Sequence, residues 1–127
     1  MLIQTALFSP RKLQAIEDFE SSACSLGLEI RVHPFGGTGF FSNGCELAHL
    51  HGNGLFDALV GAAQRDEALA KYDAIPHHVF PQSGWVSFWM HDPEDVRAAV
   101  GLTRLAKTHR QAHWIDNPEA LEEEKLS

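Results

Sequence analysis

The stretch FFSNGCELAHLH, residues 40–51, decides the fold of this chain. Its centre is the dipeptide Asn43-Gly44, which readily accepts the positive φ angles of a type I′ turn at both positions. Runs of strand-forming and apolar residues flank that dipeptide on both sides. We therefore predict a β-hairpin with a two-residue turn at Asn43-Gly44.

The returning strand of this hairpin carries two histidines with the spacing H-x-H. Successive side chains of a strand point to opposite faces, so His49 and His51 share a face with their Cβ atoms about 7 Å apart. Two imidazoles at that distance can chelate one metal ion. The same alternation predicts Cys45, Leu47, His49 and His51 on one face and Glu46, Ala48 and Leu50 on the other.

The segments before the hairpin have the pattern of a helix followed by a strand. Ser9 can cap the helix, with Pro10 at its first position, and apolar residues recur at helical spacing until Gly27. Residues 28–35, LEIRVHPF, are typical of a strand.

The segments after the hairpin alternate between strand and helix patterns. Residues 55–60 add a short strand, residues 62–72 have helix-forming composition, and residues 84–90 are aromatic and β-branched as in a buried strand. Asp92 then caps a final helix that reaches residue 110 or beyond. The order α-β-β-(β)-α-β-α predicts an α+β fold, in which a small antiparallel sheet carries helices on one face.

The length and composition fit one domain. The chain has 127 residues, 44% hydrophobic and 21% charged, which is enough for one buried core. We assign residues 1–115 to a single α+β domain and residues 116–127 to an acidic, loosely ordered tail.

The charge and the cysteines limit the expected partners and location. The formal charge is −7 and no cluster of Lys or Arg is present, so we expect neither nucleic acid nor an anionic membrane as a partner. There is no apolar window of eighteen residues, and the first basic pair follows the first apolar stretch, which is the reverse of a signal peptide. Cys24 and Cys45 form no CxxC pair. These features favour a cytoplasmic protein, whose oligomeric state the sequence leaves open.

A candidate site is centred on the two strand histidines. The short turn Gly52–Gly54 keeps Asp57 near the strand end, so Asp57 is expected within reach of His49 and His51. Three interpretations stay open: hydrogen-bonded structural histidines, catalytic acid/base histidines, and metal ligands. In the metal interpretation His77 joins His49 and His51.

Residues around the last strand supply further candidates for ligand binding. Only one of His77 and His78 is expected to join the site, because neighbouring side chains of an extended segment diverge. Ser83 offers a hydroxyl and Trp85 an indole N–H, although Trp85 also suits a hydrophobic core. The predicted ligand-binding residues are Asp57, His78, Ser83 and Trp85.

Several of these motifs together resemble the small bacterial proteins of the luciferase-domain family, also catalogued as a domain of unknown function. The resemblance spans about residues 35–107. Its motifs are FGG at 35–37, ELAHLHG at 46–52, Asp57, PHHVFPQSGWVSF at 76–88 and DVRAAVGLTRL at 95–105. Two stretches depart from the family pattern: Ala58-Leu59-Val60 and Lys107-Thr108-His109.

The leading interpretation of these residues is a small-molecule-binding protein with a histidine-lined pocket, and the resemblance implies its enzymatic form. In its enzymatic form, the implied activity is a cofactor-independent oxygenation, in which a histidine removes a proton and the anion reacts with oxygen. A divalent metal is the alternative cofactor. The rival interpretation is a non-catalytic interaction or regulatory protein whose histidines are structural.

Overall fold

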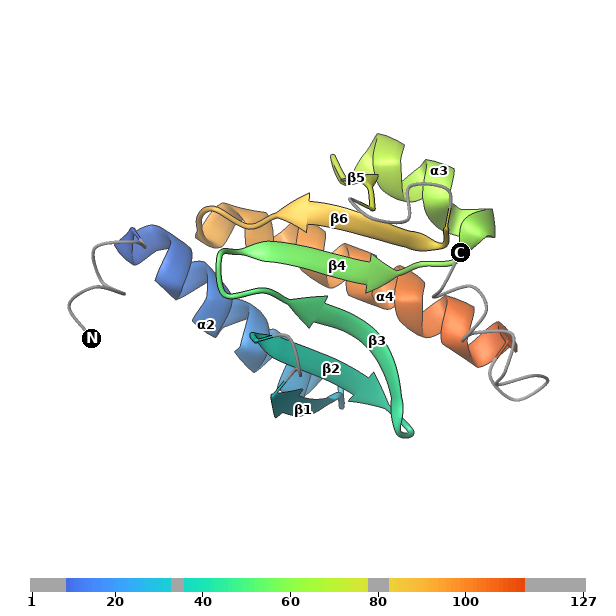
Figure 1. Ribbon diagram of the computed structural model, residues 1–127, viewed down its shortest axis with the longest axis horizontal. Helices are drawn as coiled ribbons and strands as arrows, with labels where there is room; N and C mark the ends of the chain where they lie inside the picture. The colour runs from blue at the N-terminus through green and yellow to red at the C-terminus, as the bar shows by residue number, and fades with distance from the viewer. Residues whose placement is uncertain (1–8, 33–35, 78–82, 114–127) are drawn as a thin grey trace.

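A computed structural model describes residues 9–32, 36–77 and 83–113 of the chain. Its six-stranded antiparallel sheet has the strand order β1-β2-β3-β4-β6-β5, and helices α2 and α4 lie behind it (Figure 1). This arrangement confirms the predicted α+β fold. The elements are α2 Pro10–Ser25, β1 Glu29–Val32, β2 Thr38–Ser42, β3 Cys45–Leu50, β4 Leu55–Leu59, α3 Ala62–Lys71, β5 Ile75–Pro76, β6 Trp85–Trp89, the 3₁₀ helix η1 Pro93–Asp95 and α4 Val96–His113.

Helix α2 begins and ends where local chemistry predicts. The Ser9 side chain accepts a hydrogen bond from the backbone N–H of Lys12 at 3.1 Å, and Pro10 occupies the first turn. After the helix, Gly27 adopts a φ of +81°, a conformation that terminates helices and favours glycine.

The central hairpin has the predicted turn. Ser42 pairs with Cys45 across it, and Asn43 and Gly44 have φ angles of 52° and 79°. Positive φ at both central residues is the type I′ signature, so this prediction is confirmed.

A β-bulge interrupts the alternation of β3. Phe40 pairs with Ala48 and Phe41 pairs with Glu46, so Leu47 is an extra residue in β3. Leu47 packs into the core, only 1% exposed. The predicted faces of Leu47 and Glu46 were therefore wrong, because strict alternation does not hold across a bulge.

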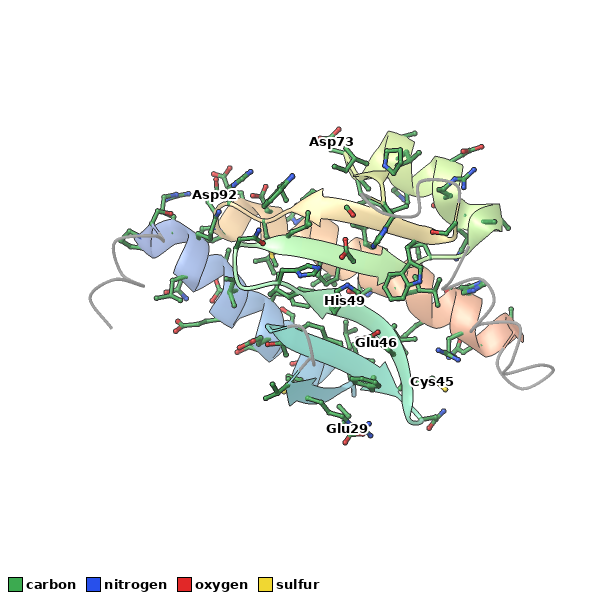
Figure 2. All side chains as sticks on the ribbon, in the orientation of Figure 1. Glu29, Cys45, Glu46, His49, Asp73 and Asp92 are labelled. Atoms are coloured by element: carbon green, nitrogen blue, oxygen red, sulfur yellow. The ribbon has the colours of Figure 1, made fainter. Side chains whose placement is uncertain are left out.

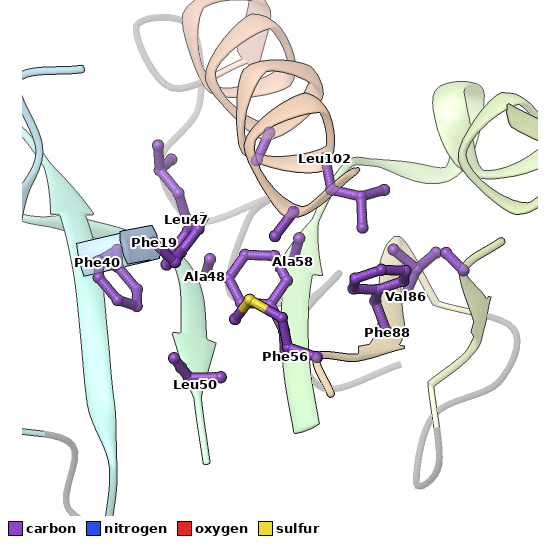
Figure 3. Packing of buried hydrophobic residues seen from close by; sticks show 14 of the residues in the cluster. Phe19, Phe40, Leu47, Ala48, Leu50, Phe56, Ala58, Val86, Phe88 and Leu102 are labelled. Carbon is purple, nitrogen blue, oxygen red and sulfur yellow. The ribbon is translucent and has the colours of Figure 1, made fainter. Parts of the chain in front are cut away.

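The core lies between the sheet and the two long helices. The Phe19 ring of α2 makes edge-on contacts with Phe40 and Phe56, at centroid distances of 5.0 and 4.8 Å. Helix α4 contributes buried residues such as Leu102 (Figure 3). Helices α2 and α4 thus cover one face of the sheet.

The C-terminal part begins with a capping box. The Asp92 side chain accepts from the N–H of Glu94, and the Asp95 side chain accepts from the N–H of Asp92.

The two-residue strand β5, which was not predicted, pairs with β6 on the sheet edge, where Pro76 is tolerated. The predicted tail, residues 116–127, lies outside the described residues. In the described part of the chain, no helix combines the length and apolar character needed to span a membrane.

Candidate functional site

A row of directly paired residues crosses the middle of the sheet. His49 of β3 is opposite Asp57 of β4, and Asp57 is opposite Ser87 of β6. Directly opposed residues of antiparallel strands share a face. Since Ala48 and Leu50, the neighbours of His49, enter the core, this row lies on the face turned away from α2 and α4.

Asp57 is the centre of this row and is fully buried. Its Oδ2 atom accepts hydrogen bonds from Nε2 of His49 at 2.9 Å and from Nε2 of His51 at 2.8 Å. The Ser87 hydroxyl donates to the other carboxylate oxygen, Oδ1, at 2.6 Å. The predicted proximity of His49, His51 and Asp57 is therefore confirmed.

The short β3–β4 connection explains how Asp57 reaches both histidines. The backbone N–H of His51 donates to the carbonyl of Leu55, and the N–H of Gly54 donates to the carbonyl of His51. These bonds close the turn and start the β3–β4 pairing immediately after it. Asp57 then lies opposite His49, one strand away.

Glu46 is a second carboxylate on the same face, although strict strand alternation predicts it on the other. Its Oε2 atom lies 3.6 Å from Nδ1 of His49, and the two side chains are only 9% and 13% exposed (Figure 2). The bulge at Leu47 turns Glu46 to this face. Gly39 leaves room for it, because a Cβ at Gly39 would stand 3.1 Å from the same Oε2 atom.

The two carboxylates determine the charge state of His49. Burial alone would lower the pKa of His49, but hydrogen bonding to Asp57 and Glu46 outweighs it and raises the pKa to about 9. For Asp57, burial alone would raise the pKa, whereas hydrogen bonds with His49, His77 and Ser87 hold it well below its usual range. The cluster thus contains an ionised Asp57 carboxylate beside the imidazolium of His49.

The remaining predicted residues are His77, His78 and Ser83. His77 is buried, with Nε2 3.6 Å from Asp57 Oδ2. Ser83 is also buried, and its hydroxyl accepts a hydrogen bond from the backbone N–H of Trp85 at 3.2 Å. His78 lies outside the described residues.

Trp85 lies directly beside the cluster. Its ring centroid is 5.1 Å from that of His49 and 6.2 Å from that of His77. The side chain is 2% exposed and packs with Leu59 in a small cluster separate from the main core. Within the described ranges, its indole N–H has no hydrogen-bond partner. Trp85 is therefore an apolar wall of the site with one polar atom.

Ser87 is a site residue that was not predicted from the sequence. It lies in the apolar strand WVSFW and is fully buried. A buried serine needs a hydrogen-bond partner, so a hydroxyl within an aromatic strand was the available signal.

The ligand atoms of His49, His51 and Asp57 all lie within 4.8 Å of one another. Two imidazoles and a carboxylate in this arrangement can transfer protons, stabilise an anion or bind a transition-metal ion.

A comparison with protein families matches residues 44–106 to the family described as Luciferase domain. This match confirms the family resemblance over that segment. The searches of curated proteins and of solved structures found no match.

Proposed function

From the luciferase-domain match of residues 44–106, we propose that this chain binds a small organic molecule at the cluster of His49, His51 and Asp57 and promotes its reaction with oxygen. The observation that carries the proposal is the convergence of two imidazoles on the fully buried Asp57 carboxylate. Buried, charged hydrogen-bonding clusters away from the core are characteristic of functional sites.

The substrate class follows from the charges at the site. An enol, a phenol or an activated carbon acid suits the site, because an imidazole that takes up the proton of such a molecule stabilises the anion left beside it. Asp57 orients both imidazoles through hydrogen bonds and stabilises the charged form of His49. Trp85 and Leu59 make the surroundings of the imidazoles apolar, which strengthens their interactions with a charged group.

His51 is the group best placed to exchange a proton with that molecule. Its side chain is 27% exposed, compared with 13% for His49. Because Nε2 of His51 contacts Asp57, the exchange with the bound molecule takes place at Nδ1. The substrate anion then donates an electron pair to O₂, a C–O bond forms, and the peroxide anion takes the proton back from Nδ1 of His51 to give a hydroperoxide.

A coloured phenol tests this proposal. The visible absorption of 4-nitrocatechol changes when its hydroxyl ionises, so binding as an anion is read directly from the spectrum. We expect the full-length protein to bind it in ionised form at a pH at which most of the free compound is neutral. His51→Gln should weaken binding at least about tenfold, the effect of losing one charged hydrogen bond.

His91→Gln is the matched control. His91 is exposed, belongs to no part of the cluster and stacks on Trp89. Equal binding by the wild type and His51→Gln, or loss of binding in His91→Gln, would contradict the proposal.

One observation favours a second, structural role for the cluster. Asp57 ties β3 to β4 and β6 through His49 and Ser87, which is what a buried polar network does in a non-catalytic protein. In that case His49→Gln and His51→Gln should destabilise the chain, and no variant should alter small-molecule binding. The same titration, combined with urea unfolding, separates the two roles.

A further inference from the structure

We propose that the side chains of His49, His51 and Asp57 form the binding site of one divalent first-row transition-metal ion. This inference goes beyond the proposed small-molecule function and stands independently of it. It concerns the cofactor of the site, for which iron(II), zinc and manganese are the fitting class.

The first step is the distance between ligand atoms. Imidazole nitrogens and carboxylate oxygens bind such ions at about 2.1 Å, so neighbouring ligands stand about 3.0 to 3.4 Å apart in octahedral or tetrahedral sites. The Nε2 atoms of His49 and His51 are 2.9 and 2.8 Å from Asp57 Oδ2. The three ligand atoms all lie within 4.8 Å of one another, so an ion would bind once side-chain rotations bring all three pairs into that range.

The ring nitrogen of His49 that does not face Asp57 also has a carboxylate partner. A metal-bound histidine usually donates its remaining N–H to a carboxylate or a carbonyl. Nδ1 of His49 faces the Glu46 carboxylate at 3.6 Å, while Nε2 faces Asp57. Glu46 thus lies where the outer carboxylate of a metal site would lie.

The two carboxylate oxygens of Asp57 have different partners. Oδ1 accepts the Ser87 hydroxyl, and Oδ2 faces the imidazole nitrogens. A ligating carboxylate is commonly held by a hydrogen bond to its second oxygen in this way. His77, with Nε2 3.6 Å from Oδ2, lies close enough to complete or shield the site.

Two of the three ligands also lie on rigid strands, while His51 follows the end of β3. His49 and Asp57 are paired residues of β3 and β4, so the sheet fixes their separation. His51 is part-exposed, which leaves access for an exchangeable ligand. Two histidines and one carboxylate with open positions characterise mononuclear iron(II) sites that activate oxygen.

Cobalt(II) provides the test, because its visible absorption reports both binding and coordination geometry. Untagged full-length protein is treated with EDTA, dialysed and titrated with Co²⁺. We expect visible d–d bands that saturate at one ion per chain. His51→Gln should lower the affinity at least about a hundredfold, and Glu46→Gln, which removes an outer partner only, about ten- to a hundredfold.

The variants are chosen to separate loss of the site from loss of the fold. Asp57 is fully buried, so its replacement also endangers folding, whereas His51 is the most exposed ligand. His91→Gln serves as the control and should bind Co²⁺ like the wild type. Absence of stoichiometric Co²⁺ binding by protein with a native circular dichroism spectrum, or unchanged binding in His51→Gln, overturns the inference.

The result for the metal is distinguishable from that for the small molecule. If EDTA-treated protein binds 4-nitrocatechol and no Co²⁺, the metal inference fails while the proposed function stands. If Co²⁺ binds and 4-nitrocatechol binds to neither form, the proposed function fails while the metal site stands.

Discussion

The two histidines of the cluster differ in their contacts and in their exposure. His49 is held at both ring nitrogens, between Asp57 and Glu46, and is more buried than His51. His51 reaches Asp57 from the end of β3 and remains part-exposed. His49 is thus the better anchor, and His51 is the better contact for a ligand.

The position of His51 also depends on a glycine in the preceding loop. A Cβ at Gly37 would stand 2.2 Å from the Leu50 carbonyl oxygen and 3.0 Å from the His51 Cα, and these are backbone atoms that cannot swing away. Gly36 has a similar φ, +87° compared with +91°, but no atom within 4 Å of an added Cβ. The two glycines therefore separate conformational strain from steric clash.

We predict that Gly37→Ala destabilises the chain much more than Gly36→Ala does. In both variants the strain of a non-glycine residue at positive φ lowers the free energy of unfolding by about 1 kcal/mol. In Gly37→Ala the backbone must also move away from the added methyl group, which lowers it by about a further 1–3 kcal/mol. Urea unfolding followed by circular dichroism measures both. Equal losses of stability would show that the loop relaxes around the added methyl group.

At the level of elements, short-range rules predicted most of what positions the site. The turn at Asn43-Gly44, the cap at Ser9 and the shared face of His49 and His51 each depend on residues within four positions of one another. Glu46 was misplaced because a bulge arises from pairing between whole strands, which no local pattern reveals. Ser87 was missed for the same reason, since its partner Asp57 is thirty positions away.

The cap before α4 gives a prediction at this scale. Asp92→Ala removes the oxygen that accepts from the Glu94 N–H, so it should cost about 1 kcal/mol of unfolding free energy. Asp92→Asn keeps an acceptor there and should cost less than about half of that. The exposed Arg11–Asp92 contact, 3.8 Å long, adds little to either value. Thermal or urea unfolding of the two variants checks the order, and a larger loss in Asp92→Asn would contradict the capping role.

At the scale of the whole molecule, the hydrophobic core and the candidate site lie on opposite faces of the sheet. Its one face packs on α2 and α4, and its other face carries the charged cluster (Figures 1 and 2). The luciferase-domain match begins at residue 44, yet α2, β1 and β2 precede it and share its core. The folding unit among the described residues is therefore larger than the matched segment.

Phe19 tests that conclusion, because it lies outside the matched segment and contacts rings on both sides of its boundary. Phe40 precedes residue 44 and Phe56 follows it. Phe19→Ala should therefore lower the unfolding free energy of the whole chain by about 3–5 kcal/mol, the usual cost of emptying a buried aromatic site. Leu13→Ala, on the same helix but 50% exposed, is the control and should change it by less than about 1 kcal/mol. If α2 and the matched segment fold as one unit, urea transitions followed by far-ultraviolet circular dichroism and by tryptophan fluorescence should shift together in Phe19→Ala. A shift confined to the circular dichroism signal would mean that α2 unfolds separately from the sheet that carries the site.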